Sequence, residues 1–184
     1  MTEKSNNSVP ERILDFDLSS ELNHGIVVSN LAYDVAKALG LEEKICYELA
    51  IAGMLHDIGK LRLIGYINGG EVDPLLVEEL KYVRMHSTLG YEALKGQGYS
   101  EFILESVLYH HENYDGSGYP SNLQGEEIPL GARILRVCDV FSALTMDRVY
   151  RQAFDTDTAI ELMIEEIKNF DMRVFLAFQR VIHR

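Results

Sequence analysis

Several features that would place this 184-residue chain in a common functional class are missing from it. It has no tryptophan and only two cysteines, Cys46 and Cys138, which lie far apart in apolar stretches and form no Cys-x-x-Cys pair. Neither a disulfide framework nor a cysteine-based zinc site is therefore expected. Free cysteine behaves as a small apolar residue, so both thiols are predicted to be reduced and buried in the core.

The chain also lacks a long apolar run and a cluster of basic residues. The apolar stretch 49–55 is far shorter than the roughly 20 residues of a membrane-spanning helix, and the first residues do not resemble a signal peptide. The formal charge is -12, from 29 acidic and 17 basic side chains. Because binding to a nucleic acid polymer requires basic residues along a groove, we expect no nucleic acid partner. A cytoplasmic protein without membrane contact is expected.

What the chain does contain is a nearly continuous helical pattern. From residue 19 onward, apolar residues recur at spacings of three and four, whereas residues 1–18 are polar. Helices are expected over about 22–39, 45–56, 74–95, 101–111, 129–144, 156–167 and 171–184. Thr156 is expected to cap the start of the helix at 156–167. The segment 113–120 is rich in turn residues and is expected to be a structured loop. The sequence also allows a short two-stranded element at 62–67.

These patterns predict the all-α fold class. The chain length suits one core, so we expect one domain over residues 19–184, preceded by a flexible polar leader at 1–18. Six to eight helices would form a compact bundle.

The histidines are concentrated where surface residues are not expected. Five of the six lie within or at the ends of apolar helical stretches: His24, His56, His86, His110 and His111. Taken singly, each is more simply explained as a core histidine with satisfied ring nitrogens. Taken together they favour a metal site, because a buried imidazole is costly without partners and one metal cluster satisfies several rings.

Two carboxylates extend this pattern. Asp57 directly follows His56, and Asp139 interrupts an apolar run, where a carboxylate needs a cation or a strong donor. Neighbours on a helix point about 100° apart, which suits two ions better than one, and Asp57 could bridge ions ~3.5 to 4 Å apart. Nitrogen and oxygen ligands without sulfur suit iron, manganese, zinc or nickel. Such a centre would be positive and would attract a phosphodiester despite the acidic surface.

Three motifs now identify a family. The chain has HDIGK at 56–60, HHE at 110–112 and DGSGYP at 115–120, followed by Asp139, and this order resembles the HD-GYP branch of the HD-domain phosphohydrolases. The resemblance runs from about residue 24 to residue 151. It implies an all-helical HD domain with a non-haem di- or trimetal centre that hydrolyses cyclic di-GMP to pGpG, GMP or both.

The resemblance also implies roles for individual residues. The expected metal ligands form two sets that share Asp57: His24, His56, Asp57 and Asp139 for one ion, and Asp57, His86, His110 and His111 for the other. The remaining roles concern the substrate. Lys60 would meet the scissile phosphate and act with Asp57 in catalysis, Arg148 and Arg151 would hold the other phosphate and guanine, and Tyr119 would shape the loop beside the pocket.

Some positions depart from the family pattern. Ser20 stands where some members have a glutamate for a third metal, and Glu21 is about 100° away around the helix, so two ions are expected, with iron or manganese favoured. Val27 and Asn113 replace residues that are commonly basic, and segment 64–77 lacks the usual Lys-Pro-Gly character. The alternatives are therefore a hydrolase of another nucleotide or a noncatalytic signalling adaptor. Regulation of the activity is expected to come from outside this domain, for example from a signalling protein partner.

Overall fold

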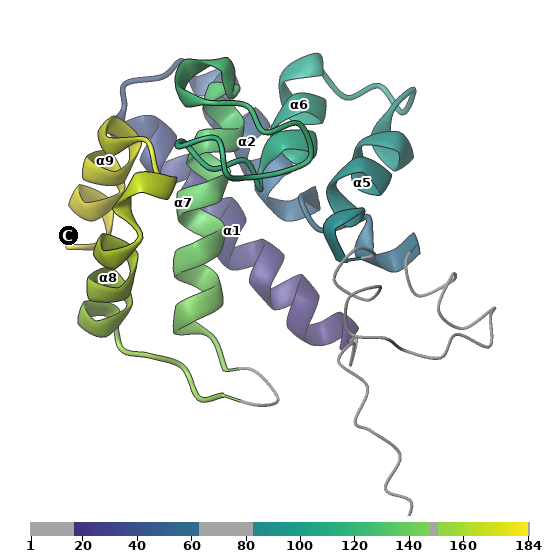
Figure 1. Cartoon of the computed structure of the whole chain (residues 1–184). Helices are drawn as coiled ribbons and strands as arrows, with labels where there is room; N and C mark the ends of the chain where they lie inside the picture. Colours follow the sequence, from purple (N-terminus) through teal and green to yellow (C-terminus); the bar gives the residue numbers. More distant parts are fainter. Residues whose placement is uncertain (1–16, 63–82, 148–150, 184) are drawn as a thin grey trace, which may run out of the picture.

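The computed structural model describes residues 17–62, 83–147 and 151–183, and within these ranges the chain folds into helices without a strand (Figure 1). The seven α-helices are α1 (Leu18–Ala38), α2 (Glu43–Leu55), α5 (His86–Leu94), α6 (Glu101–Tyr109), α7 (Leu130–Thr145), α8 (Thr156–Glu165) and α9 (Met172–Ile182). Two 3-10 turns, η1 (Gly125–Glu127) and η2 (Ile167–Asn169), complete the fold. The predicted all-α class is confirmed. No helix in the described ranges combines the length and apolar character needed to cross a bilayer.

Capping side chains fix where several helices begin. The carboxylate of Asp17 accepts from the backbone N–H of Ser19 at the start of α1, and the hydroxyl of Ser100 accepts from Ile103 at the start of α6. Helix α8 is capped by Asp155, whose carboxylate accepts from the N–H of Thr158, so the expected cap at Thr156 is wrong by one residue. Residues 1–16, which include most of the expected leader, and segment 63–82 lie outside the described residues.

The core forms around α1 and α7. Helix α1 packs against α2, α7 and α9, while α7 also contacts α6 and α8, so α5 lies towards one end of the bundle and α8 and α9 towards the other (Figure 1). Fully buried side chains at these contacts include Val28 and Leu49, with Phe178 packed edge-on against Phe141 at a centroid distance of 4.9 Å. Cys46 and Cys138 are buried and free, as predicted.

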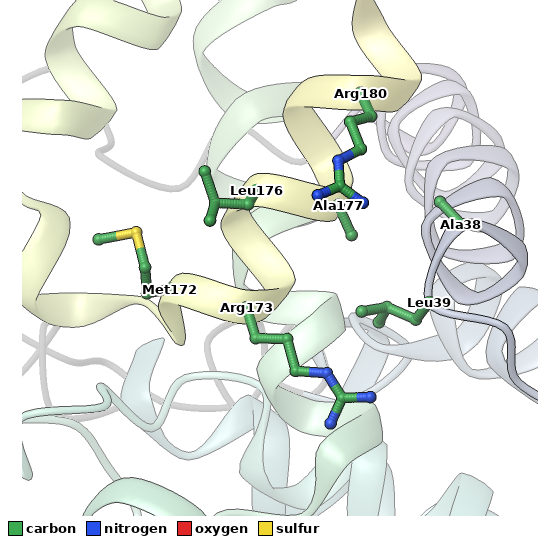
Figure 2. A pocket seen from close by; sticks show the side chains of 7 residues that line it. All are labelled: Ala38, Leu39, Met172, Arg173, Leu176, Ala177 and Arg180. Carbon is green, nitrogen blue, oxygen red and sulfur yellow. The ribbon is translucent and has the colours of Figure 1, made fainter.

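A hollow of about 450 Å³ lies between the end of α1 and the outer part of α9 (Figure 2). Its lining includes Leu39, Leu176 and the two arginines Arg173 and Arg180. None of its lining residues is a histidine or a carboxylate, and none belongs to the predicted site. The expected chemistry therefore has to be sought elsewhere in the bundle.

Candidate metal centre

All seven predicted metal ligands meet at the junction of α1, α2, α5, α6 and α7. They form two groups, and within each group one ligand atom per residue lies within 4.8 Å of all the others. The groups are His24, His56 and Asp139, and Asp57, His86, His110 and His111. The structure thus brings together residues that are up to 115 positions apart in the chain.

Helix ends present three of these histidines in the same way. His56 directly follows α2 and His110 directly follows α6, where the last carbonyls of a helix have no partner within it. Ring Nδ1 of each lies 2.7 Å from the carbonyl oxygen three residues earlier, that of Gly53 and Val107 respectively. His86 makes the same contact with the carbonyl of Val83. In all three rings Nδ1 therefore carries a proton, and in the neutral rings of His86 and His110 Nε2 has a free lone pair.

The Nε2 atoms of this group lie close together. Nε2 of His86 lies 3.2 Å from Nε2 of His110 and 3.1 Å from Nε2 of His111. Because Nδ1 carries the proton in His86 and His110, their Nε2 atoms cannot hydrogen-bond to each other, so this pair needs a shared cation. In the other group, the buried Nε2 of His56 makes no hydrogen bond. The donor set and its unsatisfied atoms fit divalent metal ions.

Asp57 lies between the two groups. One carboxylate oxygen, Oδ2, is 3.2 Å from Nε2 of His56, and the other, Oδ1, is 3.2 Å from Nε2 of His86. Oδ1 is buried and accepts no hydrogen bond. This placement, with one oxygen facing each group, supports the predicted bridging role.

His24 is oriented by two residues of α7. Its Nε2 lies 3.0 Å from Oδ1 of Asp139, and its Nδ1 lies 2.9 Å from the hydroxyl of Ser142, one turn further along α7. The role of Ser142 was not predicted, because only the packing of α1 on α7 brings it to the ring. The hydroxyl fixes the ring orientation in the way that outer hydrogen bonds orient metal-binding histidines.

Burial and neighbouring charges give the histidines of the two groups different pKa values. Burial, together with the adjacent His111, holds the pKa of His110 well below its ordinary value, and burial lowers the pKa of His111 to about 3. Burial also opposes the charged form of His56, but the carboxylates of Asp57 and Asp139 outweigh it and raise the pKa of His56 to about 10. At neutral pH the first two rings are neutral, whereas His56 is protonated.

This difference predicts unequal proton release on metal binding. An ion entering the group that contains His56 must displace its proton, so about one proton is released at pH 7 and affinity rises with pH up to about 10. The ion held by His110 and His111 should release close to none, because their pKa values lie below the working range. Calorimetry in buffers of different ionisation enthalpy measures both quantities. Equal proton release for the two ions would contradict the prediction.

Lys60 lies at the edge of the centre between two carboxylates. Its Nζ is 2.7 Å from Oδ2 of Asp57 and 2.9 Å from Oε2 of Glu21. Partial burial opposes its charge, but Asp57 and Glu21 raise the pKa of Lys60 above its ordinary value. Glu21 is thus paired with the lysine, and the lysine carries a firmly held positive charge beside the predicted ligands.

The structure describes only one of the two arginines predicted to hold the substrate. Arg148 lies outside the described residues. The guanidinium of Arg151 donates to the carbonyls of Ala143 at 2.7 Å and Leu144 at 3.0 Å, and it lies over the ring of Phe154. Its nitrogens therefore cap the end of α7, and the structure does not bring them to the metal ligands.

Tyr119 contacts the centre through its ring. It stacks on His111 at a centroid distance of 4.8 Å, and its backbone N–H donates to the carbonyl of His111. Burial raises the pKa of the Tyr119 hydroxyl, so the side chain stays neutral. Gly118 must be glycine for steric reasons, since a Cβ there would lie 2.2 Å from the backbone nitrogen of Asn113. These contacts support a loop-shaping role for Tyr119.

Two further residues hold the same loop, and neither role was predicted. Glu112 is buried, and its carboxylate accepts from the backbone N–H groups of Ser121 at 2.6 Å and Leu123 at 3.2 Å. Arg136 of α7 donates from Nε to Oδ1 of Asn113 at 3.0 Å. The sequence offered a clue to each: Glu112 belongs to the HHE motif, and Arg136 is a charged residue within the apolar run of α7.

Comparison with known proteins gives this arrangement a context. The family described as HD domain matches residues 8–174. The chain is 37% identical over 163 residues to the cyclic di-GMP phosphodiesterase PA4108 of Pseudomonas aeruginosa, covering 86% of this chain and 38% of that protein. It is 39% identical over 159 residues to the cyclic di-GMP phosphodiesterase response regulator RpfG of Xanthomonas campestris pv. campestris, covering 83% and 41%. The chain thus spans about two fifths of the length of these relatives.

Other relatives differ in named substrate or are known by structure. The 3'3'-cGAMP-specific phosphodiesterase 1 of Vibrio cholerae is 34% identical over 167 residues, which are 89% of this chain and 38% of that protein. Among solved structures, Bd1817 of Bdellovibrio bacteriovorus, described as an HDG"Y"P protein, matches with a TM-score of 0.69 at 18% identity, over 89% of this chain and 53% of that one. The extent of the family match and the shared fold agree with the motifs at 56–60, 110–112 and 115–120. The chain belongs to the HD-domain family, in agreement with the HD-GYP resemblance of its motifs.

Proposed function

We propose that this chain is a metal-dependent phosphodiesterase that hydrolyses cyclic di-GMP to pGpG, GMP or both. The observation that carries the proposal is the position of Asp57, with one oxygen towards each of two groups of buried ligands. Two ions held this way suit the in-line displacement of a phosphodiester. The names of the relatives PA4108 and RpfG support cyclic di-GMP as the substrate.

The residues of the chain would divide the work as follows. Bound ions would activate the attacking water and neutralise charge on the phosphate. Lys60, charged and fixed by Asp57 and Glu21, would stabilise the leaving oxygen electrostatically, because its raised pKa makes it a poor proton donor. The Tyr119 loop would limit access of bulk water on the side of His111.

The metal content is part of the proposal. We infer two ions, with iron or manganese favoured and zinc or nickel compatible with the same ligands. His86, His110 and His111 would hold one ion, His24, His56 and Asp139 the other, and Asp57 would bridge them. We also infer that the protein acts in the cytoplasm and is regulated by a signalling protein.

A second candidate substrate has a specific observation in its favour. Three relatives from Vibrio cholerae are named as 3'3'-cGAMP-specific phosphodiesterases, at 31% to 34% identity. A cyclic dinucleotide of different base composition would therefore use the same centre with a different base contact. A noncatalytic adaptor is less favoured, because all seven residues predicted as metal ligands lie in two groups that could each hold an ion.

The test is turnover by anaerobically purified protein reconstituted separately with ferrous iron and with manganese. Cyclic di-GMP and 3'3'-cGAMP are supplied in parallel, and products are separated by chromatography. Formation of pGpG or GMP from cyclic di-GMP supports the proposal, and faster cleavage of 3'3'-cGAMP favours the second candidate. Fully loaded protein that cleaves neither would contradict both.

A further inference from the structure

Arg136 is a charged, partly buried residue of α7, the helix that also carries Asp139. It precedes Asp139 by three positions, so the two side chains share one face of the helix. Its Nε donates to Oδ1 of Asn113 at 3.0 Å, which holds the guanidinium against the loop that carries Tyr119. One of its three nitrogens is therefore fixed in place by the protein.

The two terminal nitrogens of this guanidinium are not committed to the protein. Within residues 17–62, 83–147 and 151–183, Arg136 has Asn113 as its hydrogen-bond partner and forms no ion pair. Two other cations lie near these residues: Lys60 contacts two carboxylates, and Arg84 lies over the ring of Tyr119 at 5.5 Å from its centroid. Arg136 thus combines a fixed position with free donors.

Its surroundings favour an anion as the missing partner. Burial has the largest effect on Arg136 and lowers the pKa of its guanidinium. The nearby Asp139 and Tyr119 act in the opposite direction and raise it. A partly buried guanidinium such as that of Arg136 binds an anion more strongly than one on an open surface. Guanidinium groups also match phosphate oxygens with two parallel donors.

We propose that Arg136 is a substrate-binding residue whose terminal nitrogens hold a phosphate oxygen of the phosphodiester at the metal centre, with Asn113 fixing its orientation. The inference rests on the proposed function and adds a contact to it. The alternative is that Arg136 only braces the loop through Asn113. A brace would affect loop stability without affecting phosphate affinity.

The test compares Arg136→Ala, Arg136→Lys and Asn113→Ala with the wild type. Arg180→Ala serves as the control for lost charge, because Arg180 is exposed and lines the hollow at α9 (Figure 2). Equilibrium binding of a hydrolysis-resistant phosphorothioate analogue of cyclic di-GMP to metal-loaded protein is measured by calorimetry, alongside metal content and thermal unfolding.

Arg136→Ala should weaken binding about tenfold with unchanged metal content, whereas Asn113→Ala, which keeps the charge, should weaken it only about threefold. Arg180→Ala should bind like the wild type. If Arg136→Ala does not fold, Arg136→Lys decides, since lysine cannot bind Asn113 and phosphate together and should lose about threefold or more.

Binding within twofold of wild type in the folded Arg136 variants would overturn the proposal, even if wild-type protein cleaves cyclic di-GMP. If the wild type neither binds the analogue nor cleaves cyclic di-GMP, the proposed function fails separately. Inorganic phosphate then replaces the analogue as the probe. Tenfold weaker phosphate binding by Arg136→Ala supports the proposal, and equal binding overturns it.

Discussion

Replacing Asp57 with asparagine is expected to abolish turnover and to lower the bound metal to less than half of the wild-type content. The substitution keeps the shape of the side chain but removes the negative charge that lies 3.2 Å from both His56 and His86. Loss of a single group that stabilises charge in a transition state costs about 10² to 10³ in rate. Asp57 faces both ligand groups, so the rate should fall by at least roughly a thousandfold.

The matched control is Asp34→Asn, which removes an exposed carboxylate near the C-terminal end of α1. This variant should keep its metal and its rate, which shows that net charge alone is not responsible. Metal content is measured by atomic emission and rate by chromatography of cyclic di-GMP products. An Asp57→Asn protein that is folded, holds its metal and retains a tenth of the activity would rule out a bridging role.

Replacing Gly59 with alanine should destabilise the fold by about 3 kcal/mol, the upper part of the usual cost of overpacking. A Cβ at Gly59 would lie 1.9 Å from the carbonyl oxygen of His86 and 2.6 Å from the backbone nitrogen of Gly90. Both atoms belong to the backbone of α5, so no side-chain rotation relieves the clash. Helix α5 would have to move away and would take the ring of His86 with it.

Chemical denaturation measures this loss, and metal content reports the displacement of His86. Gly96→Ala provides the comparison, because Gly96 has a φ of +80° but open space around it. It should cost only about 1 kcal/mol through backbone strain. If Gly59→Ala were as mild as Gly96→Ala and kept its metal, the contact of the HDIGK turn with α5 would not support the site.

The sequence was sufficient to predict the helical class and to single out the histidines and aspartates that the structure brings into two groups, because both show regular patterns in the sequence. Apolar spacing marks the helices, and His24, His56 and Asp139 stand out as polar residues in apolar stretches. Helix ends were less predictable: the cap of α8 is Asp155 because its carboxylate reaches the N–H of Thr158, a choice between two neighbouring polar residues that spacing cannot make.

Roles that depend on contacts between distant segments were not predictable. The pairing of Glu21 with Lys60 joins α1 to the turn after α2, and Glu112 binds backbone groups of a loop nine and eleven residues further on. For Arg151 the substrate contact stays a prediction, and nothing in the sequence indicated that its guanidinium donates to the carbonyls that end α7. Such partners depend on the three-dimensional arrangement of the helices.

The hydrogen bond from a histidine Nδ1 to the carbonyl three residues earlier is useful for protein engineering. His56 and His110 each obtain their orienting partner from the last turn of their own helix, at Gly53 and Val107. Each histidine and its preceding turn thus form a self-contained unit that needs no help from the rest of the protein to point Nε2 outward. Such a unit could be grafted onto the end of a helix in an unrelated scaffold, and several grafted helix ends aimed at one point would supply a designed ligand set.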